Sequence, residues 1–114
     1  MSFAKLGSNI EFKKVYRKGR SKANKYLVMY VVKDQSGPNR YVFSVSKKVG
    51  NSVQRHRITR LLRETVRKYD ANMTEGNRII IIARPSVNGK SLDEVSQAVL
   101  QLYKAHKIWK GSAE

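Results

Sequence analysis

The 114-residue sequence contains no cysteine, which excludes a disulfide framework and any metal site built on thiolates. It has no apolar run approaching the roughly 20 residues that a membrane-spanning helix needs. Its first seven residues, MSFAKLG, lack the apolar core of about 7–15 residues that signal peptides carry. We therefore expect a cytoplasmic protein that does not associate with a membrane.

Acidic residues are also scarce, with 8 Asp and Glu against 24 Lys and Arg, which gives a formal net charge of +16. The excess lies in residues 1–68, which hold 18 basic and 3 acidic residues, whereas residues 69–114 hold 6 and 5. A charge that served solubility alone would be spread evenly, so this distribution indicates a polyanion partner. The length and the 40% apolar content predict one domain over residues 1–114, with its core at about 8–110.

Residues for independent catalysis are few. Hydrolysis needs paired carboxylates, an activated nucleophile or a metal site. The two histidines, His56 and His106, are predicted on different helices, and no carboxylate lies at ligand spacing from either. His56 stands among arginines and is expected to meet solvent or phosphate, whereas His106 is expected to be packed and hydrogen-bonded. We predict no catalytic residue and no protein-held metal or cofactor in this chain.

Three residue pairs at capping-box spacing predict where three helices begin. These pairs are Ser8 with Glu11, Asn51 with Gln54, and Ser91 with Glu94. The first helix is expected to end at Gly19 in a left-handed cap, and the last to continue toward Trp109.

Three segments rich in β-branched and aromatic residues, 26–32, 40–46 and 78–84, are predicted strands. In the first, alternation places Tyr26, Val28, Tyr30 and Val32 on one face. The third reads RIIIIAR without alternation, which is typical of a central strand covered on both faces. The order α-β-β-α-β-α predicts an α+β sandwich with a small mixed sheet.

The predicted helix after Asn51 has two unlike faces. An apolar stripe recurs at helical spacing through Ile58, Leu61, Leu62, Thr65, Val66 and Tyr69. The opposite side carries His56, Arg57, Arg60, Arg63 and Arg67. A run of charge is often only a solvated face, but Glu64 is almost the only acid available here for i,i+4 pairing. Because the planar guanidinium group forks onto phosphate, we favour phosphate binding.

Three aromatic residues, Phe12, Tyr16 and Tyr30, allow two interpretations. Their spacing suits ordinary core packing. The competing interpretation is a platform on which unpaired bases stack. Composition and spacing leave both open.

The segments EFKKVYRKG, ANKYLVMY, FSVSKKVGNSVQRHRITRLLRE and RIIIIARP, taken in order, resemble the protein subunit of bacterial ribonuclease P over roughly residues 9–108. The central block is the most specific, since it is similar to that family's Ser-Lys-Lys, Gly-Asn turn and Arg-Asn-Arg helix. The resemblance implies an endoribonuclease in which a large RNA, holding Mg²⁺, removes the 5′ leader of precursor tRNA. It also implies a left-handed β-α-β crossover, where general rules favour the right-handed form.

The resemblance also implies partners and roles for particular residues. The partners are ribonuclease P RNA and precursor tRNA, with no protein partner implied. A cleft for the single-stranded leader would carry Phe12, Tyr16 and Tyr30. The RNA-binding residues would be Lys47, Lys48, Asn51, Arg55, His56, Arg57, Arg60, Arg63 and Arg67.

Two residues depart from the family pattern. His56 stands where asparagine is usual, and Thr59 stands where lysine is usual. The short N-terminal segment also lacks extra basic residues. The alternative function is a structural RNA-binding protein of ribosomal type, in which the three aromatics would be ordinary core. A DNA-binding helix-turn-helix is disfavoured because no second helix follows the basic one after a 3–4-residue turn.

Overall fold

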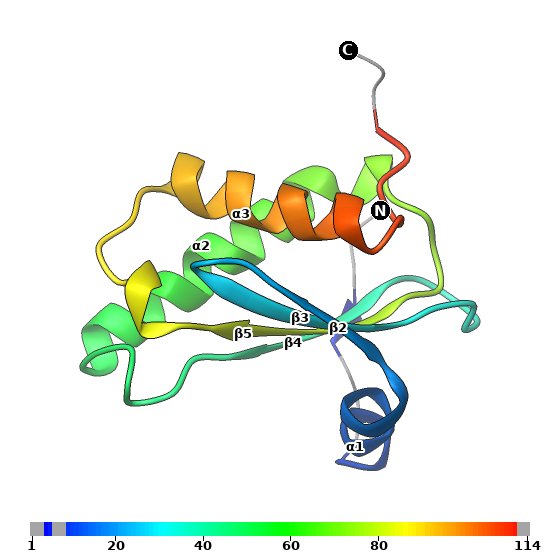
Figure 1. Ribbon diagram of the computed structural model, residues 1–114, viewed down its shortest axis with the longest axis horizontal. Helices are drawn as coiled ribbons and strands as arrows, with labels where there is room; N and C mark the ends of the chain where they lie inside the picture. Colours follow the sequence, from blue (N-terminus) through cyan, green and yellow to red (C-terminus); the bar gives the residue numbers. More distant parts are fainter. Residues whose placement is uncertain (1–3, 6–8, 112–114) are drawn as a thin grey trace.

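The computed structural model describes residues 4–5 and 9–111 (Figure 1). Its strands are β1 (Ala4–Lys5), β2 (Arg20–Ala23), β3 (Leu27–Val32), β4 (Arg40–Ser44) and β5 (Arg78–Ala83). Its α-helices are α1 (Asn9–Lys18), α2 (Ser52–Tyr69) and α3 (Leu92–Ala105), and short 3₁₀ turns follow α2 and β5. None of the helices in these described ranges is long and apolar enough to cross a membrane.

The sheet is mixed, with the strand order β1-β4-β5-β3-β2. Strand β5 pairs in parallel with β4 and antiparallel with β3, so the isoleucine-rich strand is central, as predicted. The α+β class and the mixed sheet are confirmed. Strands β1 and β2 were not predicted, because β1 has two residues and β2 reads RSKA, whose residues are all exposed and show no apolar alternation.

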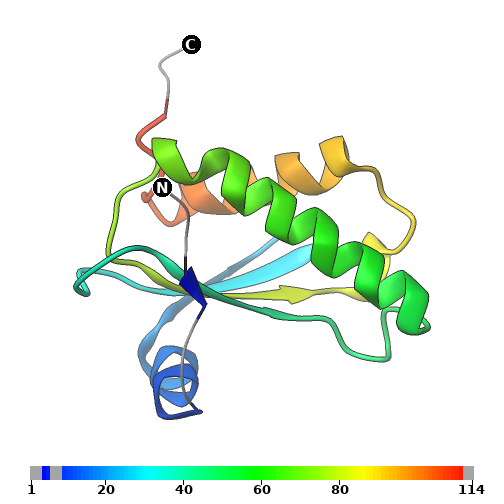
Figure 2. The same cartoon turned by 180° about the vertical axis from the view of Figure 1, so that it is seen from behind.

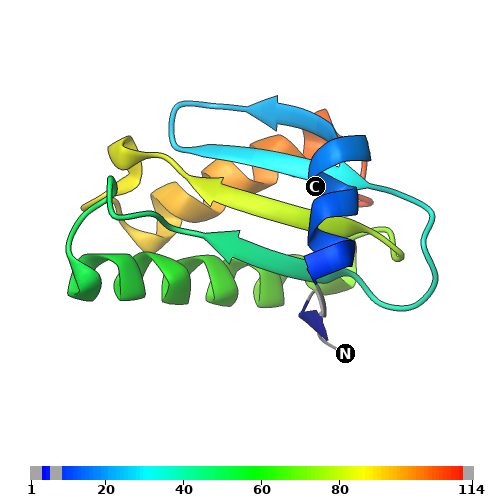
Figure 3. The same cartoon turned by 90° about the horizontal axis from the view of Figure 1, so that it is seen from below.

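The crossover from β4 through α2 to β5 is left-handed. The two strands are parallel neighbours. Figure 3 views the sheet from the side that bears α1, and there both strands run from right to left, β5 lies above β4, and α2 lies behind the sheet. A path that turns behind the sheet in this sense advances as a left-handed coil, against the usual preference. The expected handedness is confirmed.

Helices α2 and α3 cover one face of the sheet, and α1 packs on the other (Figures 1 and 2). The main core lies beneath α2 and α3, where Leu27, Met29 and Val31 of β3 are buried. A smaller cluster lies beneath α1, around the buried side chains of Val15 and Ile80. The alternation predicted along β3 is confirmed from residue 27 onward.

Tyr26 is the exception to that alternation. It precedes β3 and packs against the main core rather than beside α1, so its predicted face is wrong. The reason is that Tyr26 lies outside the paired strand, where strand alternation no longer fixes its direction.

The helix starts at Asn51 and Ser91 are confirmed, since each residue forms a reciprocal capping box. Ser8 lies outside the described residues. Helix α1 ends at Lys18 as predicted, but the left-handed cap at Gly19 is wrong, because its φ is not positive. Glycine is needed there for space: a Cβ would lie 2.5 Å from the Val15 carbonyl oxygen.

Candidate nucleic-acid interface

Helix α2 is positioned by its cap and its buried stripe. The backbone N–H of Gln54 donates to Oδ1 of Asn51 at 2.9 Å, and the N–H of Asn51 donates to Oε1 of Gln54 at 2.8 Å. The cap occupies the side-chain oxygen of Asn51, so its amide NH₂ is the group that it can offer to RNA. The lysines of the preceding turn, Lys47 and Lys48, are both exposed.

The buried side of α2 matches the predicted apolar stripe in its centre. Ile58, Leu62, Thr65 and Val66 are buried. The hydroxyl of Thr65 shares a 3.0 Å hydrogen bond with the hydroxyl of Ser96 on α3, which satisfies both polar groups. The flanking members of the stripe, Leu61 and Tyr69, are only half-buried.

The opposite side of α2 presents four exposed basic or imidazole side chains, His56, Arg60, Arg63 and Arg67. Within residues 4–5 and 9–111, none of these side chains forms an ion pair. Glu64 is the one acid beside Arg60, Arg63 and Arg67 in the described lining of this side, so most of their repulsion is uncompensated. An RNA phosphate chain would relieve this repulsion, because each contact pairs a guanidinium with an anion.

Two of the predicted arginines differ from the others. Arg55 is half-buried, and its Nε donates to the carbonyl oxygen of Gly50 at 3.2 Å. Arg57 is also half-buried and donates to the carbonyl oxygen of Lys90 at 2.9 Å. Each guanidinium group therefore donates one hydrogen bond within the protein, and its other N–H groups can contact RNA.

Two shallow hollows lie along the basic side of α2. A hollow of about 530 Å³ is lined by Ser52, Val53, His56, Arg57 and Arg60. A second, of about 320 Å³, follows along the same helix. Its lining residues are Arg60, Leu61, Arg63, Glu64 and Arg67. His56, which stands where the family usually has asparagine, therefore lines the first hollow.

The three aromatic residues lie together between α1 and β3. The ring centroids of Phe12 and Tyr16 are 5.7 Å apart, and those of Tyr16 and Tyr30 are 4.8 Å apart in an edge-to-face arrangement. Phe12 and Tyr30 are half-buried against the small core cluster, whereas Tyr16 is 49% exposed. The cluster therefore has features of both core packing and a stacking platform. Its rings pack against the small core cluster on one side and are exposed to solvent on the other.

Helix α1 leaves part of its sheet face open beside this aromatic cluster of Phe12, Tyr16 and Tyr30. In Figure 3, α1 crosses one end of the strands, and no described helix lies over their other end. Val28, Val42 and Ile82 on this face are only half-buried. An extended strand of unpaired bases would therefore find an apolar surface next to the aromatic rings.

An ion pair that the sequence did not indicate fixes α1. Nε of Arg78 donates to Oε2 of Glu11 at 2.9 Å, and the two residues are 67 positions apart in the chain. Neither residue belongs to a recognisable motif, because pairing at such separation depends on the tertiary fold. Glu11 therefore connects α1 to the central strand.

The described residues contain no cluster of three or more His, Asp or Glu side chains that could hold a metal ion. They do not fit an Mg²⁺ site held by protein alone. His56 lies exposed among the arginines, and His106 is buried with Nε2 2.9 Å from the carbonyl oxygen of Met29. The packing predicted for His106 is confirmed.

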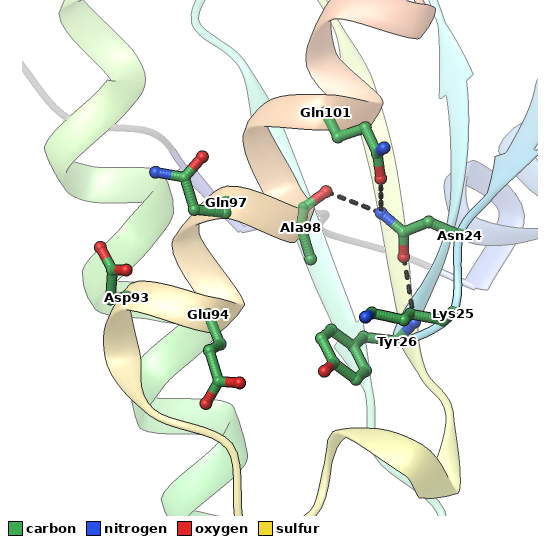
Figure 4. Close-up of a pocket in the computed structure, with 8 residues that line it drawn as sticks. All are labelled: Asn24, Lys25, Tyr26, Asp93, Glu94, Gln97, Ala98 and Gln101. Atoms are coloured by element: carbon green, nitrogen blue, oxygen red, sulfur yellow. Dashed lines mark hydrogen bonds between the residues drawn. The ribbon is translucent and has the colours of Figure 1, made fainter.

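A pocket of about 370 Å³ between the β2–β3 turn and α3 differs in charge from α2 (Figure 4). Its rim includes Asp93 and Glu94, and the Ser91 cap lowers the pKa of Glu94 by hydrogen bonding to its carboxylate. The side-chain NH₂ of Asn24 donates to the Ala98 carbonyl oxygen at 3.0 Å and to Gln101 at 2.8 Å. These bonds tie the turn to α3, and the acidic rim does not suit a polyanion.

The arginine-rich helix, the uncompensated charge and the half-open aromatic cluster together define a small α+β RNA-binding protein. Comparison with known proteins narrows this class. A family model described as Ribonuclease P matches residues 2–107. The ribonuclease P protein component of Lachnoclostridium phytofermentans is 52% identical over 90% of this chain and 89% of that protein. The counterpart in Alkaliphilus metalliredigens is 42% identical over 91% of this chain and 94% of that protein.

Solved structures agree with these relatives. The Staphylococcus aureus RNase P protein superposes with a TM-score of 0.83 at 29% identity, over 92% of this chain and 96% of that one. The Thermotoga maritima RNase P protein, at 24% identity, shares the fold with a TM-score of 0.80 over 89% of this chain and 96% of that one. The chain belongs to the ribonuclease P protein family, the protein part of the endoribonuclease that matures the 5′ ends of tRNA. The ribosomal-type alternative is not favoured.

Proposed function

We propose that this chain binds the RNA subunit of ribonuclease P through α2 and holds the 5′ leader of precursor tRNA against the aromatic cluster. The observation that carries the proposal is the presence of two different surfaces on one small protein. One surface is a row of arginines that form no ion pair within residues 4–5 and 9–111. The other is a set of half-exposed rings beside an open sheet face.

The α2 side suits a structured RNA. Arg60, Arg63 and Arg67 are exposed, and a guanidinium forks onto phosphate oxygens without reading sequence. Lys47 and Lys48 extend the same charge to the turn before the helix. Such contacts fix register and orientation on the RNA, as a subunit interface requires.

The aromatic side suits an unpaired strand. Tyr16 offers a ring that is 49% exposed, and Phe12 and Tyr30 flank it within 5.7 Å and 4.8 Å between ring centroids. Stacking of a base on an aromatic ring contributes about 1–3 kcal/mol and tolerates any base. The site would therefore hold leaders of different sequence.

The chemistry would remain with the RNA. The described residues offer no ligand set for Mg²⁺ and no paired acid and base, so the metal ions would be held mainly by the RNA subunit. The contribution of the protein would be electrostatic and positional, because its basic side reduces repulsion between the RNA subunit and its substrate.

The test is the Mg²⁺ dependence of cleavage. A bacterial ribonuclease P RNA is assayed on precursor tRNA over a range of Mg²⁺ concentrations, with and without the chain. We expect the chain to lower the Mg²⁺ concentration needed for half-maximal cleavage. The double variant Arg60→Gln with Arg63→Gln should lose most of that shift. An unchanged Mg²⁺ requirement with the wild-type chain would contradict the proposal.

A further inference from the structure

A second basic surface lies at the sheet edge opposite to α2. It is a groove of about 580 Å³ between β2, the end of β3 and the C-terminal end of α3. Its polar lining includes Lys18, Arg20, Lys22, Lys33, His106 and Lys107.

The groove and α2 are separated by most of the sheet. Figure 3 shows α2 along the β4 side, with β2 at the other edge. Strands β5 and β3 lie between β4 and β2, which makes three inter-strand spacings or roughly 14 Å. An RNA segment that follows the axis of α2 would have to cross α3 to contact the groove, because α3 packs against both α2 and β2.

Positive charge is concentrated in the groove. Arg20 and Lys22 lie two residues apart in β2 and therefore share one face of the strand. Lys22 and Lys33 both act on the His106 ring, whose pKa is lowered first by burial and then by these two charges. Asp34 is the one acid in the lining.

The ends of two helices account for part of this charge. Lys18 closes α1 and Lys107 follows α3, and a cation near a helix C-terminus is stabilising by about 0.3–1 kcal/mol. Arg20 follows the end of α1 at the same two-residue offset at which Lys107 follows α3, whereas Lys22 lies within strand β2 and Lys33 just after strand β3. Within the described part of the chain, none of the five cations forms an ion pair. Among the described residues, neither an ion pair nor adjacency in sequence to a helix end accounts for the charges of Lys22 and Lys33.

We propose that this groove binds the phosphate backbone of a second RNA segment, so that the chain bridges two RNA segments from opposite edges of its sheet. The inference rests on the proposed RNA-binding function and adds a site to it. Clustered lysines suit phosphates along a backbone, since the ammonium group acts as a point charge without base readout. The segment belongs either to the RNA subunit or to the precursor leader, and the test separates these two sources.

The first experiment maps RNA near the groove. Because the chain has no cysteine, one introduced thiol carries an iron–EDTA cleavage reagent to a single place. The groove variant is Ala105→Cys and the α2 variant is Ser52→Cys, since each residue lines its own hollow. The control is Gln97→Cys, which is exposed at the acidic pocket. Each is assembled as full-length chain with end-labelled ribonuclease P RNA and, separately, with end-labelled precursor tRNA present.

We expect the Ala105→Cys variant to cut one RNA segment that the Ser52→Cys variant does not cut. Cuts in the ribonuclease P RNA assign the segment to the subunit, and cuts upstream of the mature tRNA end assign it to the leader. Cutting no stronger than from Gln97→Cys would overturn the inference, as would cuts confined to the segment reached from position 52. If Ser52→Cys also fails to cut, the proposed RNA-binding function of α2 is contradicted as well. Failure of Ala105→Cys alone contradicts only the groove inference.

The second experiment measures the salt dependence of holoenzyme assembly. Lys22→Gln and Lys33→Gln should each reduce the magnitude of the salt slope by about 0.7–0.9, the value for one lost phosphate contact. Lys25→Gln is the matched control, because Lys25 is an exposed lysine beside the acidic pocket. Slopes unchanged in both groove variants, with melting temperatures equal to wild type, would overturn the inference.

Discussion

Arg78 of the central strand and Glu11 of α1 form an ion pair with Nε and Oε2 2.9 Å apart. Arg78 also donates to the carbonyl oxygens of Ser36 at 2.6 Å and Pro38 at 3.2 Å, and only 8% of the residue is exposed. The guanidinium is thus satisfied on several sides. Because Glu11 and Tyr16 belong to the same helix, this pair ties the helix that carries Tyr16 to the central strand of the sheet.

Replacing Arg78 with Gln should destabilise the protein and loosen α1. Removing one partner of a buried pair costs about 3–5 kcal/mol, and the lower end applies because the Glu11 side chain is 29% exposed. Urea unfolding measures the free energy of unfolding. Lys14→Gln, at an exposed position on α1, should change it by no more than about 0.5 kcal/mol. Equal effects of the two variants would show that the ion pair does not anchor the helix.

The buried side of α2 makes a prediction about two adjacent leucines. Leu62 is fully buried, so Leu62→Ala should cost about 2–5 kcal/mol through the cavity that it leaves. Leu61 is half-buried, so Leu61→Ala should cost clearly less, although the sequence pattern alone places the two leucines on the same stripe. Thermal or urea unfolding of both variants decides the order, and a larger loss at Leu61 would contradict the assignment of faces.

The exposed side of α2 should control RNA affinity without controlling stability. Arg60→Gln and Arg63→Gln should each lower the magnitude of the salt slope for ribonuclease P RNA by about one unit. Arg84→Gln is the matched control, since Arg84 is exposed after β5 and donates to the Asn24 carbonyl oxygen at 2.8 Å. Melting temperatures should stay near wild type for Arg60→Gln and Arg63→Gln, whereas Arg84→Gln loses its hydrogen bond to Asn24 and should melt slightly lower. Slopes that fall equally in all three variants would refute a localised α2 interface.

His106 should make stability depend on pH. Burial first, and the charges of Lys33 and Lys22 after it, lower the pKa of His106 below its ordinary value of 6.5. The unfolded chain therefore binds a proton that the folded chain does not, as pH falls through and below 6.5. The stabilising contribution is present above pH 6.5 and is lost as pH falls toward the folded pKa.

Urea unfolding at steps from pH 7.5 to pH 5 should show this decline in the wild type. His106→Gln retains a side-chain donor toward Met29 but has no proton to take up, so its decline over that window should be smaller. His56→Gln is the control because His56 is exposed. The expectation fails if His56→Gln, rather than His106→Gln, removes the dependence.

Much of the fold follows from local sequence patterns. The capping pairs at Asn51 and Ser91 predict the starts of α2 and α3 because the reciprocal hydrogen bonds are local. The run of isoleucines in β5 predicts a central strand because both of its faces are covered. These features need no knowledge of distant contacts, which is why they could be predicted.

The failures occur where tertiary contacts decide. Strand β2 exists because β3 offers it a pairing edge, although its own residues have no strand pattern. Gly19 is required by the approach of the Val15 and Val31 carbonyl oxygens rather than by a turn. The Glu11–Arg78 pair joins residues far apart in sequence. The proximity of Phe12, Tyr16 and Tyr30 was expected from family resemblance, since spacing alone left their role open.

The aromatic cluster is tested most directly by comparing precursor tRNA with mature tRNA, because only the precursor has a leader. The holoenzyme is assembled with wild-type, Tyr16→Ala and Tyr16→Phe chains, and affinity for both tRNAs is measured alongside thermal melts. Tyr16→Ala should weaken precursor binding by roughly 5- to 150-fold, equivalent to about 1–3 kcal/mol for one stacked base, and leave mature tRNA binding nearly unchanged. Tyr16→Phe should retain most of the affinity because it keeps the ring. Equal losses for precursor and mature tRNA, with melting unchanged, would contradict the account of the aromatic cluster as the leader site.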